Sequence, residues 1–395
     1  MHNVLRLLAA AAIGAIVAAC GGGDGASTTP AATVEGCPSA DVSEGEGVIY
    51  VIGNCQQVTY AGTTVLAGQE LAIGSKRIGL FKPGQWRAID NPPWQQRDGA
   101  GLLVFKGDLY LLGGWLLGPT TSEVWKTKDL INWQLVTVAP WPGRHGAGWL
   151  VHNERMYVIG GDLNDDVWSS PDGLHWTQEA SGAPFGKRYT PNAASIDGWI
   201  VVYGGQYWAP EDWCGGEPDC VAMSRRDVWR SRDGKAWEKV GDAPWAGRGL
   251  IHNSVVHNGS IYLVGGGLKA VPAGERYAET VVEYSDIWTM TKDGTWTRAG
   301  TFDFPRTHFT VLETPHGCFS VGGSVGTQGN LSNDLLYAPD CLRYAKLPVP
   351  REMPVRHAAS FAYFNDSLVI LGGPAVGDRS IWQYFVGKTG LSLAP

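Results

Sequence analysis

Pairs of adjacent glycines recur along the chain, and their spacing constrains the fold more than any other feature of the sequence. The second glycine of each pair is one of six residues: Gly114, Gly161, Gly205, Gly266, Gly323 and Gly373. Successive pairs are 44 to 61 residues apart, a period typical of arrays in which each repeat is one supersecondary unit. Such a unit cannot bury its apolar surface alone, so we expect neighbouring units to pack on one another.

The sequence around each glycine pair predicts four short antiparallel strands. Predicted first strands are 146–151, 192–196, 251–256 and 358–364, and predicted second strands are 156–161, 200–205, 261–266 and 368–373. The turns between them contain Asn153, Asp197-Gly198, Asn258-Gly259 and Asn365-Asp366, residues that tolerate positive φ. Third strands contain Trp168, Trp229 or Trp288, and after an Asp-Gly turn the fourth strands open with Trp176, Trp237 or Trp296.

A degenerate unit at the start of the repeat region fits the same frame. Its first three strands are predicted over 47–53, 57–62 and 78–82, and Trp86 would open its fourth. This unit brings the count to seven, so we predict one all-β domain of seven four-stranded sheets over residues 44–395. The alternative has six sheets, with the first unit serving as an N-terminal cap or supplying closing strands.

The pattern resembles the kelch repeat. The resemblance rests on the double glycines preceded by an aromatic residue, on the downstream tryptophan of each unit and on an arginine that closes the unit; the aromatic residues are Tyr110, Tyr157, Tyr203 and Tyr262. It covers about 44–395, nearly all of the chain beyond the leader. The resemblance implies a β-propeller, in which each repeat is one blade packed radially around a channel.

In a propeller, strand direction places the loops after the glycine pairs and the residues before the first strands on one face, which we call face A. Six arginines precede first strands: Arg97, Arg144, Arg188, Arg248, Arg306 and Arg356. We expect them to ring the channel mouth. In some kelch proteins the matching arginines hold acidic ligands, because a guanidinium pairs with a carboxylate through two hydrogen bonds. The alternative is a structural role, with bonds to backbone carbonyls or to acidic residues of neighbouring blades.

Two long insertions, 206–226 and 268–285, also fall on face A. Most of the 18 tryptophans recur in step with the repeat, which assigns them to blade packing. Three that do not are candidates for stacking on the apolar faces of sugars: Trp115, Trp208 and Trp213. The alternative is that these rings pack the insertions onto the propeller.

The first twenty residues of the chain predict an export signal. Leu7 to Ala19 is apolar and too short to span a bilayer. The sequence Val17-Ala18-Ala19-Cys20 resembles the lipobox of bacterial lipoproteins, which implies cleavage after residue 19, a lipid on Cys20 and a flexible tether over 20–43. Gly21 after the cysteine favours the outer membrane. The alternative is an ordinary secretion signal.

Six further cysteines are Cys37, Cys55, Cys214, Cys220, Cys318 and Cys341. An even number in an exported chain suggests disulfides. Cys214 and Cys220 are close enough to close a small loop. Strand order places Cys318 and Cys341 on neighbouring strands at face B, the face opposite face A, and Cys37–Cys55 then follows by elimination. None of these cysteines has zinc-site spacing.

Composition and motifs reduce the number of function classes that the chain can belong to. A net charge of −7 argues against a nucleic-acid partner. The sequence contains no HExxH or P-loop motif and no GxSxG in a strand–turn–helix context, so we assign no catalytic residue, metal or cofactor. We expect a monomeric, lipid-anchored envelope propeller that binds a glycan or a protein through face A. Two alternatives remain: an enzyme acting on acidic sugars, such as the sialic-acid mutarotases or epimerases that use the kelch propeller, and a scaffold that only binds proteins.

Overall fold

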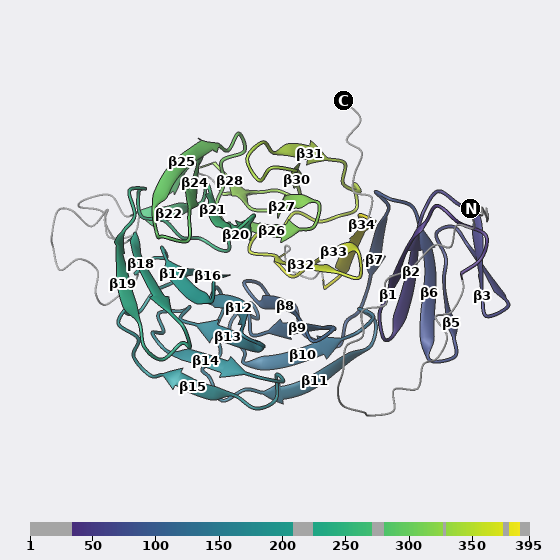
Figure 1. Cartoon of the computed structure of the whole chain (residues 1–395), viewed down its shortest axis with the longest axis horizontal. Helices are drawn as coiled ribbons and strands as arrows, with labels where there is room; N and C mark the ends of the chain where they lie inside the picture. Colours follow the sequence, from purple (N-terminus) through teal and green to yellow (C-terminus); the bar gives the residue numbers. More distant parts are fainter. Residues whose placement is uncertain (1–33, 208–223, 271–279, 327–328, 374–378, 388–395) are drawn as a thin grey trace, which may run out of the picture. The chain divides into compact units, whose positions relative to one another are not determined.

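The computed structural model describes residues 34–207, 224–270, 280–326, 329–373 and 379–387, and every regular element among them is a β-strand. Six four-stranded antiparallel sheets surround a central axis in these residues (Figure 1). We number them blades one to six from the first complete repeat. None of the described residues forms a helix long and apolar enough to cross a bilayer.

The first three blades each consist of four strands consecutive in sequence. Blade one contains β8 (Gly101–Phe105), β9 (Asp108–Leu112), β10 (Glu123–Thr127) and β11 (Trp133–Val138). Blade two contains β12 (Gly148–His152), β13 (Arg155–Ile159), β14 (Val167–Ser170) and β15 (Thr177–Ala180). Blade three contains β16 (Asn192–Ile196), β17 (Trp199–Tyr203), β18 (Asp227–Ser231) and β19 (Glu238–Asp242).

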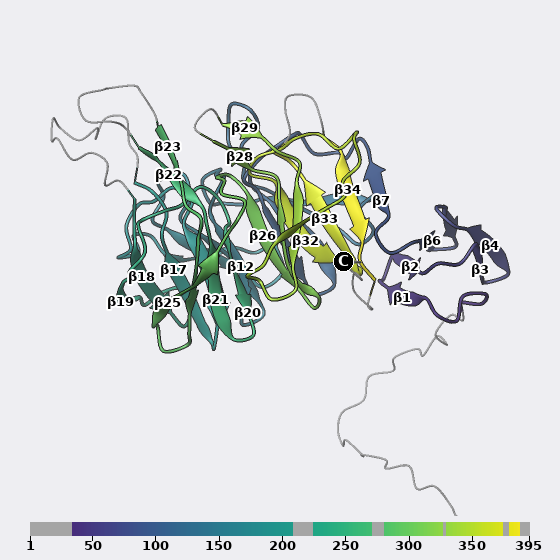
Figure 2. The ribbon, with the colours of Figure 1, turned by 90° about the horizontal axis from the view of Figure 1, so that it is seen from above.

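Blades four and five each carry an additional two-stranded hairpin. Blade four contains β20 (Ser254–His257), β21 (Ser260–Val264), β24 (Asp286–Met290) and β25 (Trp296–Thr301), with the hairpin β22 (Gly267–Ala270) and β23 (Thr280–Glu283). Blade five contains β26 (Thr310–Thr314), β27 (Gly317–Val321), β30 (Leu335–Ala338) and β31 (Ala345–Leu347), with the hairpin β28 (Ser324–Val325) and β29 (Asn330–Leu331). Figure 2 shows both hairpins on the same side of the propeller, which is face A.

Burial follows the position of a strand in its blade. The second strands β9, β27 and β33 (Ser367–Leu371) bury every residue because blades cover them on both sides. The outer strands β11 and β19 are mostly exposed or half-buried. This gradient explains why second strands are mostly continuous apolar runs, while charged residues are concentrated in the third and fourth strands.

Blade six is closed by a strand from the beginning of the chain. It contains β32 (Ser360–Phe364), β33 and β34 (Ile381–Phe385), and its fourth strand is β7 (Trp86–Ile89). Ile89 pairs with Ile381 and Trp86 with Tyr384. Trp86 opens a fourth strand as predicted, but that strand completes the last blade of the ring.

The predicted seven-blade count is therefore wrong for the described residues, and the six-blade alternative is correct. The first unit forms a sheet of β1 (Asp41–Glu44), β2 (Val48–Ile52), β6 (Lys76–Phe81) and β5 (Glu70–Ile73), with the hairpin β3 (Gln57–Tyr60) and β4 (Thr63–Leu66). In this sheet β2 and β6 pair in parallel, which no antiparallel blade allows. The propeller strands accordingly begin with β7 and not at residue 44.

This N-terminal sheet is joined to blade six through aromatic packing. The ring of Phe81 stacks on that of Phe385 with centroids 3.9 Å apart, and Tyr50 meets Phe385 edge-on at 5.2 Å. Arg87 in β7 forms an ion pair with Glu70 in β5. Cys37 and Cys55 form the predicted disulfide beside the sheet. The sheet therefore caps one side of the closing blade.

Candidate functional site

The six arginines lie directly before the first strands, as predicted, but their side chains enter the blades. Each of these residues is at most 2% exposed. In every blade Nη1 donates to the carbonyl of the first glycine of the pair, at 2.8 to 3.0 Å. These acceptors are Gly113, Gly160, Gly204, Gly265, Gly322 and Gly372.

In blades one to five the guanidinium also meets a carboxylate at the start of the third strand. The acidic partners, in blade order, are Glu123, Asp166, Asp227, Asp286 and Asp334. In blades one to four the tryptophan two residues later donates its indole N–H to the same carboxylate. A β-bulge just before that tryptophan turns the ring toward the acid.

These contacts correct the expectation that the arginines ring the channel mouth. Burial of Asp227 opposes its ionisation, but the charge and hydrogen bonds of Arg188 outweigh that cost and lower the pKa of Asp227. A guanidinium held in this way, buried and bonded to protein groups, is not presented to a ligand. We assign the series to blade structure.

A belt of hydrogen bonds runs around the channel two residues after each arginine. At that position φ is positive in all six blades, with values from 47° to 65°: Gly99, Gly146, Thr190, Leu250, His308 and Ala358. The N–H of Gly146 donates to Gly99, Gly99 to Ala358, Ala358 to His308 and His308 to Leu250. Leu250 donates to the hydroxyl of Thr190. The left-handed conformation turns the amide of each blade toward its neighbour.

The residue between the arginine and the belt carries the polar groups of the channel mouth. In blades one, two, three and six this residue is Asp98, His145, Tyr189 and His357. Together with Asp162 and Trp115, which follow the glycine pairs of blades two and one, these residues form what we call the mouth cluster. It is the principal candidate site.

One half of the mouth cluster is centred on His145. Its Nδ1 lies 2.9 Å from the carboxylate of Asp162, and its Nε2 lies 3.0 Å from the hydroxyl of Tyr189. Burial acts to lower the pKa of His145, but the hydrogen bond and charge of Asp162, helped by Asp98, raise it above the ordinary value. Burial also raises the pKa of Tyr189. This half therefore places an imidazole that is protonated more readily than usual beside a phenol that ionises less readily than usual.

The other half joins blades one and six. Asp98 Oδ2 lies 3.2 Å from Nε2 of His357, and the side chain of Asp98 is only 8% exposed. Asp98 Oδ1 and His357 Nδ1 are buried and have no hydrogen-bond partner among the described residues. The backbones of Asp98 and Trp115 are hydrogen-bonded to each other, and the ring of Trp115 lies 6.5 Å from that of His145.

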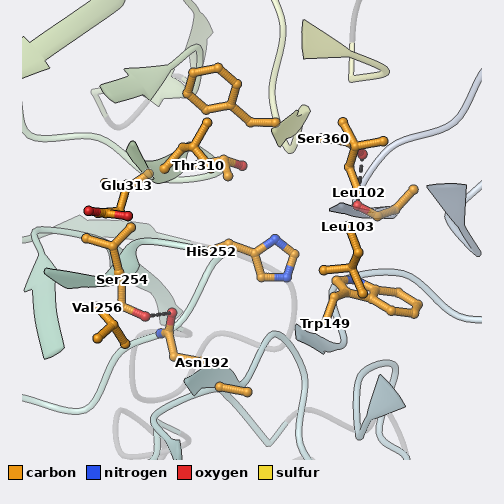
Figure 3. A pocket seen from close by; sticks show the side chains of 16 residues that line it. Leu102, Leu103, Trp149, Asn192, His252, Ser254, Val256, Thr310, Glu313 and Ser360 are labelled. Carbon is orange, nitrogen blue, oxygen red and sulfur yellow. Dashed lines mark hydrogen bonds between the residues drawn. The ribbon is translucent and has the colours of Figure 1, made fainter. Parts of the chain in front are cut away.

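The channel beneath the mouth cluster contains a cavity of about 290 Å³ lined by the first strands of the blades. His252 projects into it (Figure 3). Its Nε2 lies 2.8 Å from the carbonyl of Ala147, which belongs to blade two, whereas His252 precedes blade four. Burial lowers the pKa of His252. The neutral ring donates through Nε2 and therefore keeps Nδ1 as an acceptor.

The remaining predicted site residues are distributed as follows. Trp115 belongs to the mouth cluster, whereas Trp208, Trp213, Cys214, Cys220 and Cys20 lie outside the described residues. Cys318 and Cys341 form the predicted disulfide, with Cα atoms 5.0 Å apart. In the described part of the chain, the metal-ligating atoms of His257, Cys318 and Cys341 lie within 4.8 Å of one another, but the disulfide occupies both sulfurs.

Sequence reasoning missed Asp98, Asp162 and Tyr189, and it also missed Arg225. The guanidinium of Arg225 lies 5.6 Å from the ring of Tyr207 on face A, and its buried Nε has no hydrogen-bond partner among the described residues. A usable signal was present for Asp98 and Tyr189: the residue after each repeat arginine varies between blades, while the arginine does not.

Comparison with known proteins supports the fold alone. No protein-family model matches the chain, and no curated protein matches it. Among solved structures, it is similar to the one titled "Structure of YjhT", with a TM-score of 0.56 and 16% sequence identity. The similarity covers 74% of this chain and 95% of the other. Together with the sheet order, this similarity supports the kelch-type propeller.

Proposed function

We propose that this protein is a cell-envelope propeller that binds a glycan at the mouth cluster. The observation that carries the proposal is a pair of buried polar atoms, Asp98 Oδ1 and His357 Nδ1, that have no hydrogen-bond partner within the described part of the chain. The backbone of Asp98 pairs with that of Trp115. A buried acceptor without a partner is costly unless a ligand supplies a donor. Sugar hydroxyls supply such donors, and the apolar face of a sugar ring stacks on an aromatic side chain.

A binding experiment tests this proposal directly. The mature protein, the variant Asp98→Asn and the control variant Asp108→Asn are applied to a broad glycan array, and hits are measured by calorimetry. Asp108 is a buried carboxylate of the same blade that pairs with Lys126 at the face B end. We expect at least a tenfold loss for Asp98→Asn and none for Asp108→Asn. A protein that bound no glycan but captured envelope proteins through face A would be a scaffold instead.

A second candidate function is acid–base catalysis at the anomeric carbon of a sugar, as in a mutarotase. It is favoured by the two histidine–carboxylate pairs, His145–Asp162 and Asp98–His357. Protonated His145 can donate a proton to the ring oxygen as the bond from that oxygen to the anomeric carbon breaks. Asp98 can accept the proton of the anomeric hydroxyl as the carbonyl forms, and ring closure reverses both transfers.

An acidic sugar would need a cation, and Arg225 is the described face A guanidinium best suited to that role. NMR exchange between the anomers of sialic acid and of neutral sugars tests the activity. Catalysis that is lost in His145→Asn and retained in Asp108→Asn would establish an enzyme. If the wild-type protein does not accelerate exchange, only the binding function is left.

Anchoring to the envelope is the remaining part of the proposal. It rests on the sequence Val17-Ala18-Ala19-Cys20. Labelling with radioactive palmitate, followed by membrane fractionation, should show a labelled protein in the outer membrane. The variant Cys20→Ser should be unlabelled and retain its leader. A labelled inner-membrane protein would contradict the outer-membrane assignment only, whereas an unlabelled wild-type protein would contradict the anchor itself.

A further inference from the structure

The carboxylate of Asp98 is the group in the mouth cluster that most needs a hydrogen-bond donor from a ligand. It is enclosed by the seam between blades one and six, and among the residues that the structure describes only one of its oxygens has a partner, His357. A desolvated carboxylate oxygen is satisfied best by a donor that also carries positive charge, because charge-assisted hydrogen bonds are about twice as strong as neutral ones. The ligand group that meets Oδ1 must therefore be a donor.

The channel wall below the same seam also presents acceptors. The hydroxyl of Ser360 donates to the carbonyl of Ala100, and that of Thr310 donates to the carbonyl of Ala359. Both side chains line the cavity, so they offer it oxygen lone pairs rather than protons. His252 likewise keeps Nδ1 as an acceptor. A ligand rich in donors matches this wall.

The arginines nearest to the mouth cluster already form ion pairs inside the blades. The two arginines that precede Asp98 and His145 are Arg97 and Arg144, and each is bonded to a carboxylate inside its own blade. His145 is held by Asp162. Trp115, whose backbone pairs with that of Asp98 and whose ring lies 6.5 Å from that of His145, adds an aromatic ring to the cluster, and such a ring attracts a cation through its quadrupole. The local charge and the ring both favour a positively charged group.

We infer that the mouth cluster recognises an amino sugar, with the ligand ammonium bound at Asp98 Oδ1 next to Trp115. This inference rests on the proposed glycan-binding function and specifies the class of sugar. It differs from the expectation of an acidic ligand drawn from the sequence. That expectation depended on the six repeat arginines, whose side chains are bonded to groups inside the blades. Recognition of acidic sugars would instead depend on Arg225, which belongs to blade three and not to the seam of Asp98.

Calorimetry with four defined probes tests the inference. The probes are glucosamine oligomers, N-acetylglucosamine oligomers of equal length, oligogalacturonate and a lysine-containing peptide. We expect glucosamine oligomers to bind the wild-type protein at least tenfold more tightly than each of the others. Asp98→Asn should remove that preference, while Asp108→Asn and Arg225→Ala should retain it.

A measurement on the wild-type protein avoids dependence on the folding of any variant. Affinity for glucosamine oligomers should fall as the pH rises past the pKa of the ligand amine, and affinity for N-acetylglucosamine oligomers should not follow that fall. Preferential binding of oligogalacturonate or of the N-acetylated oligomers would overturn the amino-sugar inference and leave the glycan proposal standing. Equal binding of the lysine peptide would overturn the sugar class. If none of these probes and no arrayed glycan binds, both proposals fail.

Discussion

Arg144 and Asp166 form a two-pronged ion pair inside blade two. Nη1 of Arg144 lies 2.5 Å from Oδ1 of Asp166, and Nη2 lies 2.9 Å from Oδ2. Arg144 is fully buried, and Trp168 donates to the same carboxylate at 2.8 Å. Three side chains from successive parts of the repeat thus converge on one point, where the glycine pair also contributes a carbonyl.

Removing one partner of this pair should destabilise the protein strongly. Arg144→Met leaves the carboxylate of Asp166 buried without its cation, and we expect a loss of about 3–5 kcal/mol in the free energy of unfolding. Urea titration measures it. Arg343→Met is the control, since that side chain is 90% exposed in its pair with Asp340 and should cost no more than about 1 kcal/mol. Equal losses in the two variants would contradict the assignment.

The stability contributed by His145 should depend on pH. Because the folded protein raises the pKa of His145 above 6.5, the contribution is fully present below about pH 6.5. It is lost as the pH rises through the raised pKa. The variant His145→Gln should therefore lose more stability, relative to wild type, at pH 6 than at pH 8.5. NMR titration of His145 should also show a lower pKa in Asp162→Asn, and an unchanged pKa would contradict the pairing.

The belt should be intolerant of a side chain at Gly146. A Cβ there would meet Cγ2 of Thr190 at 2.9 Å, and φ is 58°. We expect Gly146→Ala to cost about 2–4 kcal/mol, from left-handed strain and from overpacking together. Gly259 has φ of 72° and no atom within 4 Å of its ideal Cβ, so Gly259→Ala isolates the strain at about 1 kcal/mol. Denaturant titration of both variants gives the difference, and a difference near zero would remove the packing argument.

The contact between the N-terminal sheet and blade six should depend on Phe385. Phe385→Ala deletes a fully buried ring that stacks on Phe81, and we expect a loss of about 3–5 kcal/mol. Limited proteolysis should also cut the variant faster between β6 and β7. Leu71→Ala in β5, where the side chain is 36% exposed, serves as the control. If Phe385→Ala resisted the protease as well as the wild-type protein does, Phe385 would not hold the N-terminal sheet against blade six.

The strands and turns of each blade could be predicted from the sequence because the residues that determine them lie within one repeat. The hairpin residues Asn153, Asp197 and Asn258 have the positive φ expected of them, and β16 matches its predicted range, 192–196. Pairing between distant segments could not be predicted. Trp86 carries the signature of a fourth strand, but the signature does not say which blade the strand joins.

The direction of the arginine side chains was also beyond the sequence argument. Arg144 does lie before a first strand, as predicted. Its guanidinium nevertheless points into the blade, because it pairs with Asp166 at the start of the third strand. The recurrence of that acid in step with the arginine, at Asp227 and Asp286, was visible and could have revealed the pairing. The mouth cluster is harder to foresee, because its members come from different repeats and share no motif.

The pairing of β7 with β34 determines when the propeller ring can close during folding. A nascent chain makes β7 early, but its partner is among the last segments to be synthesised. Until then the exposed edge of β7 is a template for the wrong strand, and the closing step must overcome the entropy of a loop that contains five complete blades. The first blades can assemble by local pairing, whereas the completed ring depends on one late encounter. We therefore expect the slowest folding step, and the point of greatest risk of aggregation, to lie at this single junction.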